Sequence, residues 1–147
     1  MNLYPSSILE TIEFDKIIHL LQAECNGDLA QIYFNQLQFE TDICVIENKL
    51  DEVAEMKLSL LSVDPFPVSN YFDCLADLKL LDIEGYVLSI DSLQRINIIL
   101  RIASKIYKYL NISRRDVYPN LYKIVRSTPF DEFLQREITR VIDENGE

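Results

Sequence analysis

The apolar positions of this chain recur at helical spacing, and no stretch shows the period of two that marks a strand. From residue 89 to residue 110 they follow a 3-4-3-4-3 pattern, with Ser89 placed as N-cap. The positions are Leu93, Ile96, Leu100, Ala103, Tyr107 and Leu110. Three isoleucines, Ile99, Ile102 and Ile106, widen this stripe. The pattern predicts a long amphipathic helix that faces more than one neighbour.

The same spacing predicts shorter helices on either side of this one. They cover residues 14–25, 29–36, 42–61, 71–81, 118–127 and 131–142, after a short turn at residues 8–12. Asp28 is expected to cap the helix over residues 29–36, and Thr41 or Asp42 the helix over residues 42–61. Pro65 and Pro67 predict a loop over residues 62–69. We therefore expect an all-α bundle of about six to seven helices, forming one domain over residues 1–147 that could divide only at the 62–69 loop.

The predicted core consists of the periodic apolar positions on these helices. Beside the six named above, it includes Phe14, Ile17, Leu21, Ile46, Leu50 and Val53. Lys57 falls where the 43–53 pattern next expects an apolar side chain, so the stripe on that helix should loosen there.

Cysteine usage and hydropathy indicate a cytoplasmic protein. The three cysteines are odd in number, lie far apart and form no CxxC pair, which argues against a disulfide framework and a zinc site. The N-terminus has no basic region of the kind that precedes a secretory signal. No apolar stretch approaches the ~20 residues that span a bilayer.

Glycine and histidine are too scarce for the common catalytic and nucleotide-binding motifs. Gly27, Gly85 and Gly146 are the only glycines, and their spacing excludes a phosphate-binding P-loop, a GxGxxG turn and a GxSxG elbow. His19 is the only imidazole, and its place off the apolar face of its helix favours an ordinary surface histidine. No catalytic, cofactor-binding or metal-ligating residue is predicted in this chain.

Charge divides the chain into an acidic part and a basic part. The net charge is −10, but residues 91–147 hold ten bases against eight acids. Six of these bases form a candidate nucleic-acid-facing strip, interleaved with Tyr118 and Tyr122: Lys105, Lys108, Arg114, Arg115, Lys123 and Arg126. Lysine and arginine beside aromatic rings can hold phosphates and stack on bases. The same residues could instead be the polar side of amphipathic helices that face the acidic helix at residues 42–56.

Four short stretches resemble one protein family, in the same order along the chain. Residues 9–17 (LETIEFDKI), the Thr41–Asp42 step before Ile43 and Ile46, residues 85–93 (GYVLSIDSL) and residues 138–147 (ITRVIDENGE) are similar to stretches of MutS-like proteins. The resemblance is to the second bacterial MutS subfamily, which lacks the mismatch-recognition domain. The loop around Pro65 and Pro67 departs from the pattern, because the family often has a glycine-rich stretch there.

This resemblance implies that the chain is a fragment, the N-terminal part of the helical core or lever that joins the ATPase to the DNA clamp. The parent protein would be a homodimeric DNA repair or recombination protein that binds ATP and Mg²⁺ outside this chain. Its partners would be DNA or the ribosome, and a C-terminal nuclease domain could follow. The fragment itself would be no enzyme and would act mechanically.

A stand-alone acidic helical adaptor for another protein is the alternative reading. The reading frame past Glu147 separates the two, because a GxxxxGK[ST] motif there is expected only for the MutS-like parent.

Overall fold

A computed structural model of the chain describes residues 7–25, 27–37 and 39–141 and shows an all-α fold in these ranges. The helices are α1 (Ile8–Thr11), α2 (Phe14–Ala23), α3 (Asp28–Asn35), α4 (Ile43–Leu60), α5 (Leu75–Leu80), α6 (Ile90–Tyr109), α7 (Pro119–Ser127) and α8 (Glu132–Val141). A single 3₁₀ turn, η1 (Ile112–Arg114), follows α6. The predicted fold class is confirmed, and α1 is the short turn expected at residues 8–12. The predicted end of the last helix, at residue 142, lies outside the described residues.

Two predicted caps are present and one is displaced. The Asp42 carboxylate accepts hydrogen bonds from the amides of Cys44 and Val45, and Ser89 Oγ accepts one from the Ser92 amide. Both satisfy amides that a helix start leaves without a partner. The helix predicted over residues 29–36, α3, begins one residue earlier than predicted, so that Gly27 and not Asp28 is its N-cap residue.

The helix predicted over residues 71–81 is shorter in the structure. Residues 71–74 are not helical, and α5 begins at Leu75, whose amide donates to the Asp73 carboxylate at 2.8 Å. The ring of Tyr71 lies against Gly27 so closely that a Cβ there would be 2.6 Å from Cζ of the tyrosine. A larger side chain at position 27 would force this ring to shift, and the contact places the segment before α5 beside the start of α3.

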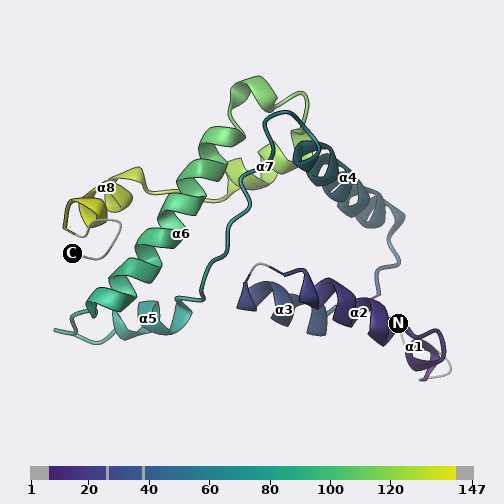
Figure 1. Cartoon of the computed structure of the whole chain (residues 1–147), viewed down its shortest axis with the longest axis horizontal. Coiled ribbons are helices and arrows are strands. Elements are labelled where there is room, and N and C mark those ends of the chain that lie inside the picture. Colours follow the sequence, from purple (N-terminus) through teal and green to yellow (C-terminus); the bar gives the residue numbers. More distant parts are fainter. Residues whose placement is uncertain (1–6, 26, 38, 142–147) are drawn as a thin grey trace.

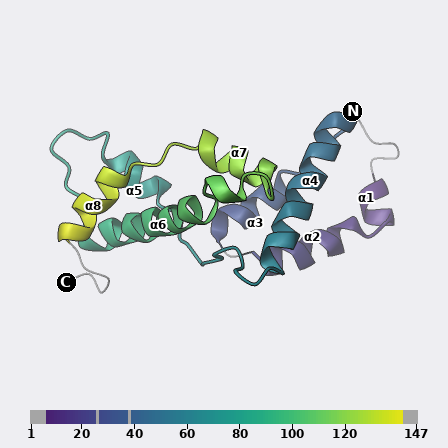
Figure 2. The ribbon, with the colours of Figure 1, turned by 90° about the horizontal axis from the view of Figure 1, so that it is seen from above.

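The helices form an open arch (Figure 1). α4 and α6 diverge from a corner where α7 packs against both of them, and α8 lies along α6. α2 and α3 form a hairpin, in which the Gln22 amide donates to Asn35 at 2.7 Å. Seen from above, α4 crosses over α2 near one end of an elongated molecule (Figure 2).

The buried core is small and lies at the corner of the arch. It is built from Tyr109, Leu110, Tyr118 and Leu121, with Met56, Phe66, Ile106 and Val125 packed around them. The total accessible surface is 11410 Å². A compact protein of 17.2 kDa would expose only about 7,800 Å². Much of the apolar surface of this fold is therefore left uncovered.

Four of the predicted core positions are exposed: Ile17, Leu21, Leu50 and Val53. Ile96 and Leu110 are buried, and the other six are half-buried. The reason is geometric, because α4 packs mainly against α7 while α2 packs against α1 and α3, and these contacts leave the four side chains uncovered. This part of the core prediction is wrong.

A buried carboxylate fixes α5 to the start of α6. Asp77 accepts hydrogen bonds from Arg95 Nε at 2.9 Å, from Arg95 Nη2 at 2.8 Å and from Ser92 Oγ at 2.8 Å. The hydrogen bonds from Arg95, and then that from Ser92, lower the pKa of Asp77 below its usual 3.8.

The lowered pKa makes Asp77 a source of acid sensitivity. A carboxyl group whose pKa is lower in the folded state stabilises the fold above the unfolded pKa and stops doing so as pH falls through the folded pKa. Wild-type protein should therefore lose stability as pH falls below about 4. Asp77→Asn should be less stable than wild type at pH 7 and should lose less on acidification. Urea unfolding followed by circular dichroism at a series of pH values measures the stability at pH 7 and its loss on acidification.

Asp51→Asn, at an exposed position on α4, is the control and should lose as much stability on acidification as wild type. Parallel curves for wild type and Asp77→Asn would contradict the assignment.

Candidate nucleic-acid interface

The six predicted strip residues lie on the last two turns of α6, on or directly after η1, and on α7, but they do not form one surface. Arg114 and Arg126 are half-buried in contacts within the fold, whereas Lys105, Lys108, Arg115 and Lys123 are exposed. The strip therefore separates into two structural arginines and four accessible bases.

Arg114 fastens the loop that follows α4 to the end of α6. Its guanidinium lies 3.7 Å from the ring centroid of Tyr109, and Nη2 donates to the Asp64 carboxylate. The Tyr109 hydroxyl donates to the backbone carbonyl of Asp64 at 3.0 Å. Burial raises the pKa of Tyr109 above its usual 10.0, which extends to higher pH the range over which this hydroxyl is protonated and can donate.

Arg126 closes the C-terminal end of α6. Its Nη2 donates to the carbonyl of Leu110 at 3.1 Å and approaches that of Tyr107 at 3.5 Å. The guanidinium lies over the Tyr107 ring at 3.8 Å and 5.2 Å from the Tyr122 ring. A cation at this end satisfies terminal carbonyls and interacts favourably with the helix dipole. The arginine binds α7 to α6.

An open hollow beside α7 brings three bases together. It has a volume of about 770 Å³ and is lined by Arg115, Asp116, Pro119, Tyr122, Lys123, Arg126 and Ser127. Arg115 and Lys123 form no ion pair within the described ranges, and Asp116 is the one acid in the lining. We call this the α7 hollow. Basic side chains around an aromatic ring are suited to a phosphate-bearing ligand.

The start of α7 is not available to such a ligand. Glu55, on α4, accepts hydrogen bonds from the Asn120 amide at 3.1 Å, the Asn120 side chain at 2.8 Å and the Leu121 amide at 2.9 Å. A carboxylate of the same chain thus occupies the site where a helix N-terminus attracts anions. Any anion in the α7 hollow would be held by side chains.

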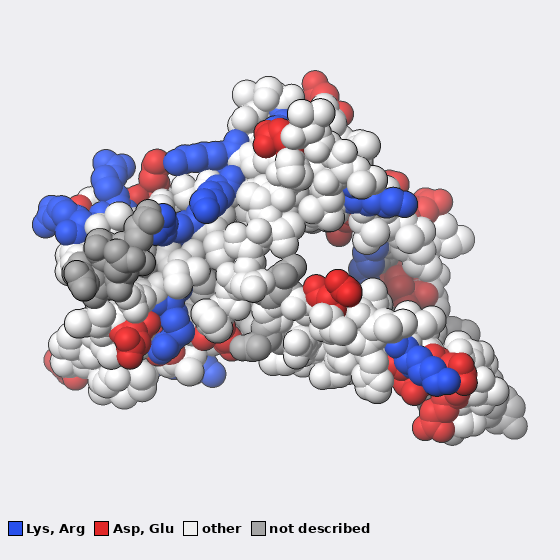
Figure 3. Space-filling model, viewed as in Figure 1, with Lys and Arg blue, Asp and Glu red and all other residues white. Residues whose placement is uncertain are grey.

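Opposite charges gather on different parts of the molecule (Figure 3). Lysine and arginine cluster on the side of α6, α7 and α8, while acidic side chains dominate around α1, α2 and α4. The charge asymmetry of the sequence is thus also spatial.

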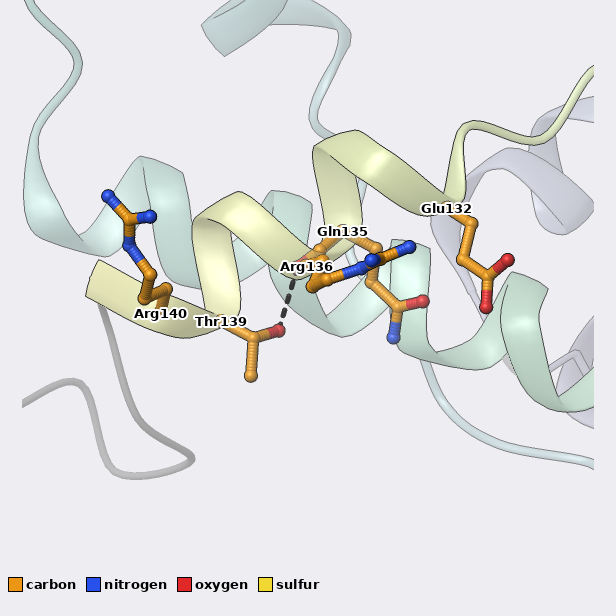
Figure 4. A pocket seen from close by; sticks show the side chains of 5 residues that line it. All are labelled: Glu132, Gln135, Arg136, Thr139 and Arg140. Atoms are coloured by element: carbon orange, nitrogen blue, oxygen red, sulfur yellow. Dashed lines mark hydrogen bonds between the residues drawn. The ribbon is translucent and has the colours of Figure 1, made fainter.

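A second depression, on α8, contains bases that the predicted strip leaves out. It has a volume of about 370 Å³ and is lined by Glu132, Gln135, Arg136, Thr139 and Arg140. Figure 4 shows these side chains along α8, with the Thr139 hydroxyl donating to the Gln135 carbonyl at 2.8 Å. The i,i+4 spacing of Arg136 and Arg140 is the sequence signal that could have found them.

None of the described residues form a group of histidine, cysteine or acidic side chains that could hold a metal ion. The three cysteines are free thiols. His19 is exposed on α2. Within the described part of the chain, no helix is both long enough and apolar enough to cross a bilayer.

Comparison with known proteins points to one kind of relative. No protein-family model matches the chain, and no solved structure matches it. It is 29% identical over 149 aligned residues to an endonuclease MutS2 of Halothermothrix orenii, covering 96% of this chain and 19% of that protein. It is 26% identical over 106 residues to an endonuclease MutS2 of Caldicellulosiruptor bescii, covering 72% of this chain and 13% of that protein. The chain thus spans about a fifth or less of the length of these relatives, and is distantly homologous to one small part of a MutS2 endonuclease.

Proposed function

We propose that this chain is a helical framework segment of a MutS2-type protein that acts on DNA. The observation that carries the proposal is the alignment of 96% of the chain with a single stretch of a much longer endonuclease MutS2. The open fold agrees with it, because helices that leave so much apolar surface uncovered are suited to packing within a larger body.

The corner of the arch suits a mechanical role. Glu55 ties α7 to α4, and Arg126 ties α7 to α6, so three helices are joined by hydrogen-bonded and stacked contacts. A displacement of one arm would be passed to the other through α7, as the transmission of an ATP-driven change requires. On this proposal ATP and Mg²⁺ bind elsewhere in the protein, the chain itself performs no catalysis, and the parent is a cytoplasmic homodimer.

The α7 hollow is the surface that we propose for DNA. Of the predicted strip, Arg115 and Lys123 are the bases free to contact phosphates there, whereas replacing Arg114 or Arg126 would also damage the fold. The variant that tests the surface therefore leaves both structural arginines in place.

Reversing two charges in the hollow should weaken DNA binding. The variant Arg115→Glu/Lys123→Glu should lower the affinity for a fluorescent DNA duplex and reduce the slope of log K against log salt by about 2, since each lost phosphate contact contributes about 0.9. Fluorescence anisotropy across a salt titration measures both quantities.

The control is Lys49→Glu/Lys79→Glu, which makes the same change of net charge at exposed positions on α4 and α5. It should have a smaller effect on both affinity and slope. Equal losses in the two variants would show that DNA responds only to overall charge and would refute the hollow as a DNA surface.

A further inference from the structure

An aromatic ring forms part of the α7 hollow. Tyr122 lines the hollow and is half-buried, so part of its ring is accessible there. The guanidinium of Arg126 lies over this ring, with Cζ 5.2 Å from the ring centroid, and it also stacks on Tyr107 at 3.8 Å. Phe130 packs next to Tyr107, with 5.6 Å between the ring centroids. This row of stacked groups holds the Tyr122 ring in position at the wall of the hollow.

The rest of the lining suits the other parts of a nucleotide. Arg115 and Lys123 are exposed cations without an ion pair in the described part of the chain, and they can hold phosphates. Asp116 is the one acid in the lining, and its carboxylate can accept a hydrogen bond from the amino group of a cytosine. The volume of about 770 Å³ is in the range of pockets that hold small ligands. The hollow therefore offers contacts to the phosphate, the face and the edge of a nucleotide.

A base within a duplex cannot use the Tyr122 ring. Both faces of such a base are covered by its neighbours, and extracting it costs a free energy comparable to or greater than the gain from stacking on one aromatic ring. An unpaired base needs no extraction. Tyr122 therefore favours DNA with unpaired bases, whereas Arg115 and Lys123 contact the phosphates of either kind of DNA.

We infer that the α7 hollow selects DNA with unpaired bases, and that Tyr122 is the stacking platform for one of them. The inference rests on the proposed function, because it requires the hollow to be a DNA surface. It adds the class of substrate that this surface prefers. One stacked base contributes a factor of about 5 to 150 in affinity.

Fluorescence anisotropy with two DNA probes tests this selection. One probe is a continuous duplex, and the other is the same duplex with a single-stranded gap of cytosines. Wild-type protein should bind the gapped probe about 5- to 150-fold more tightly than the continuous one. Tyr122→Leu should bring this ratio close to one without changing the affinity for the continuous duplex. Tyr122→Phe keeps the ring and should retain the wild-type ratio.

The control is Tyr86→Leu, at an exposed tyrosine before α6 and outside the hollow, which should also keep the ratio. Circular dichroism checks that the variants remain folded. Equal affinity of wild-type protein for the two probes would overturn the inference, as would equal losses in the two leucine variants. If Arg115→Glu/Lys123→Glu weakens both probes while Tyr122→Leu leaves the ratio unchanged, the inference fails and the proposed function stands. If the double variant weakens neither probe, both fail.

A tryptophan at position 122 reports the stacking directly. The chain contains no tryptophan, so Tyr122→Trp introduces its single indole. A base that stacks on the indole quenches its fluorescence. The gapped probe should therefore quench it, while the continuous duplex should leave it unchanged. Tyr86→Trp is the matched control and should respond to neither probe. Quenching at position 122 by both probes alike, or by neither at saturating DNA, would contradict stacking of an unpaired base.

Discussion

Replacing Leu110 with alanine should lower the free energy of unfolding by about 2–5 kcal/mol. Leu110 is only 1% exposed and lies in the small cluster with Tyr109, Tyr118 and Leu121. This cluster holds most of the buried apolar residues of the described fold, so a cavity there weakens its main core. Single domains have total stabilities of roughly 5–15 kcal/mol, so the variant should be close to unfolding at room temperature.

Urea unfolding followed by far-ultraviolet circular dichroism measures this loss. Leu61→Ala is the matched control, because the same side chain is 77% exposed at the end of α4, near the same corner. Its effect should stay within about 0.5 kcal/mol. A similar loss in both variants would mean that the corner is not the core.

Removing the carboxylate of Glu55 should be the second large effect, about 2–3 kcal/mol for Glu55→Ala. The alanine variant leaves the amides of Asn120 and Leu121 without an acceptor and removes the hydrogen bonds between α4 and α7. Glu55→Gln keeps one acceptor oxygen and should show an intermediate loss. Urea unfolding followed by far-ultraviolet circular dichroism measures the free energy of unfolding of both variants.

Glu47→Ala, on an exposed turn of the same helix, controls for helix propensity and net charge. It should leave stability within about 0.5 kcal/mol of wild type. If Glu55→Ala matched this control, the hydrogen bonds to α7 would contribute nothing to stability.

Local signals in the sequence predict the helices well. The N-caps Asp42 and Ser89 depend on hydrogen bonds to amides two or three residues away, so a short window contains all that is needed. The all-α class follows from the period of the apolar positions, for the same reason.

The partners of each helix face are not predictable from periodicity. Leu50 and Leu110 both belong to 3-4 patterns of apolar residues, yet Leu50 is exposed and Leu110 is buried. The spacing of apolar residues indicates that one face of a helix is apolar. Whether another helix covers that face depends on contacts between distant segments of the chain. For the candidate interface, the sequence identifies the bases but not the stacking of Arg114 on Tyr109 and Arg126 on Tyr107. These contacts decide which bases remain accessible.

The cap that Glu55 provides for α7 has a consequence for synthesis on the ribosome. Asn120 and Leu121 lie 65 and 66 residues after Glu55. At about 5–20 residues per second, α4 leaves the ribosome roughly 3–13 s before α7 can meet it. During that interval the polar side of α4 has no counterpart while its apolar side is already exposed. A holdase chaperone that covers this apolar side would therefore be most useful in that interval.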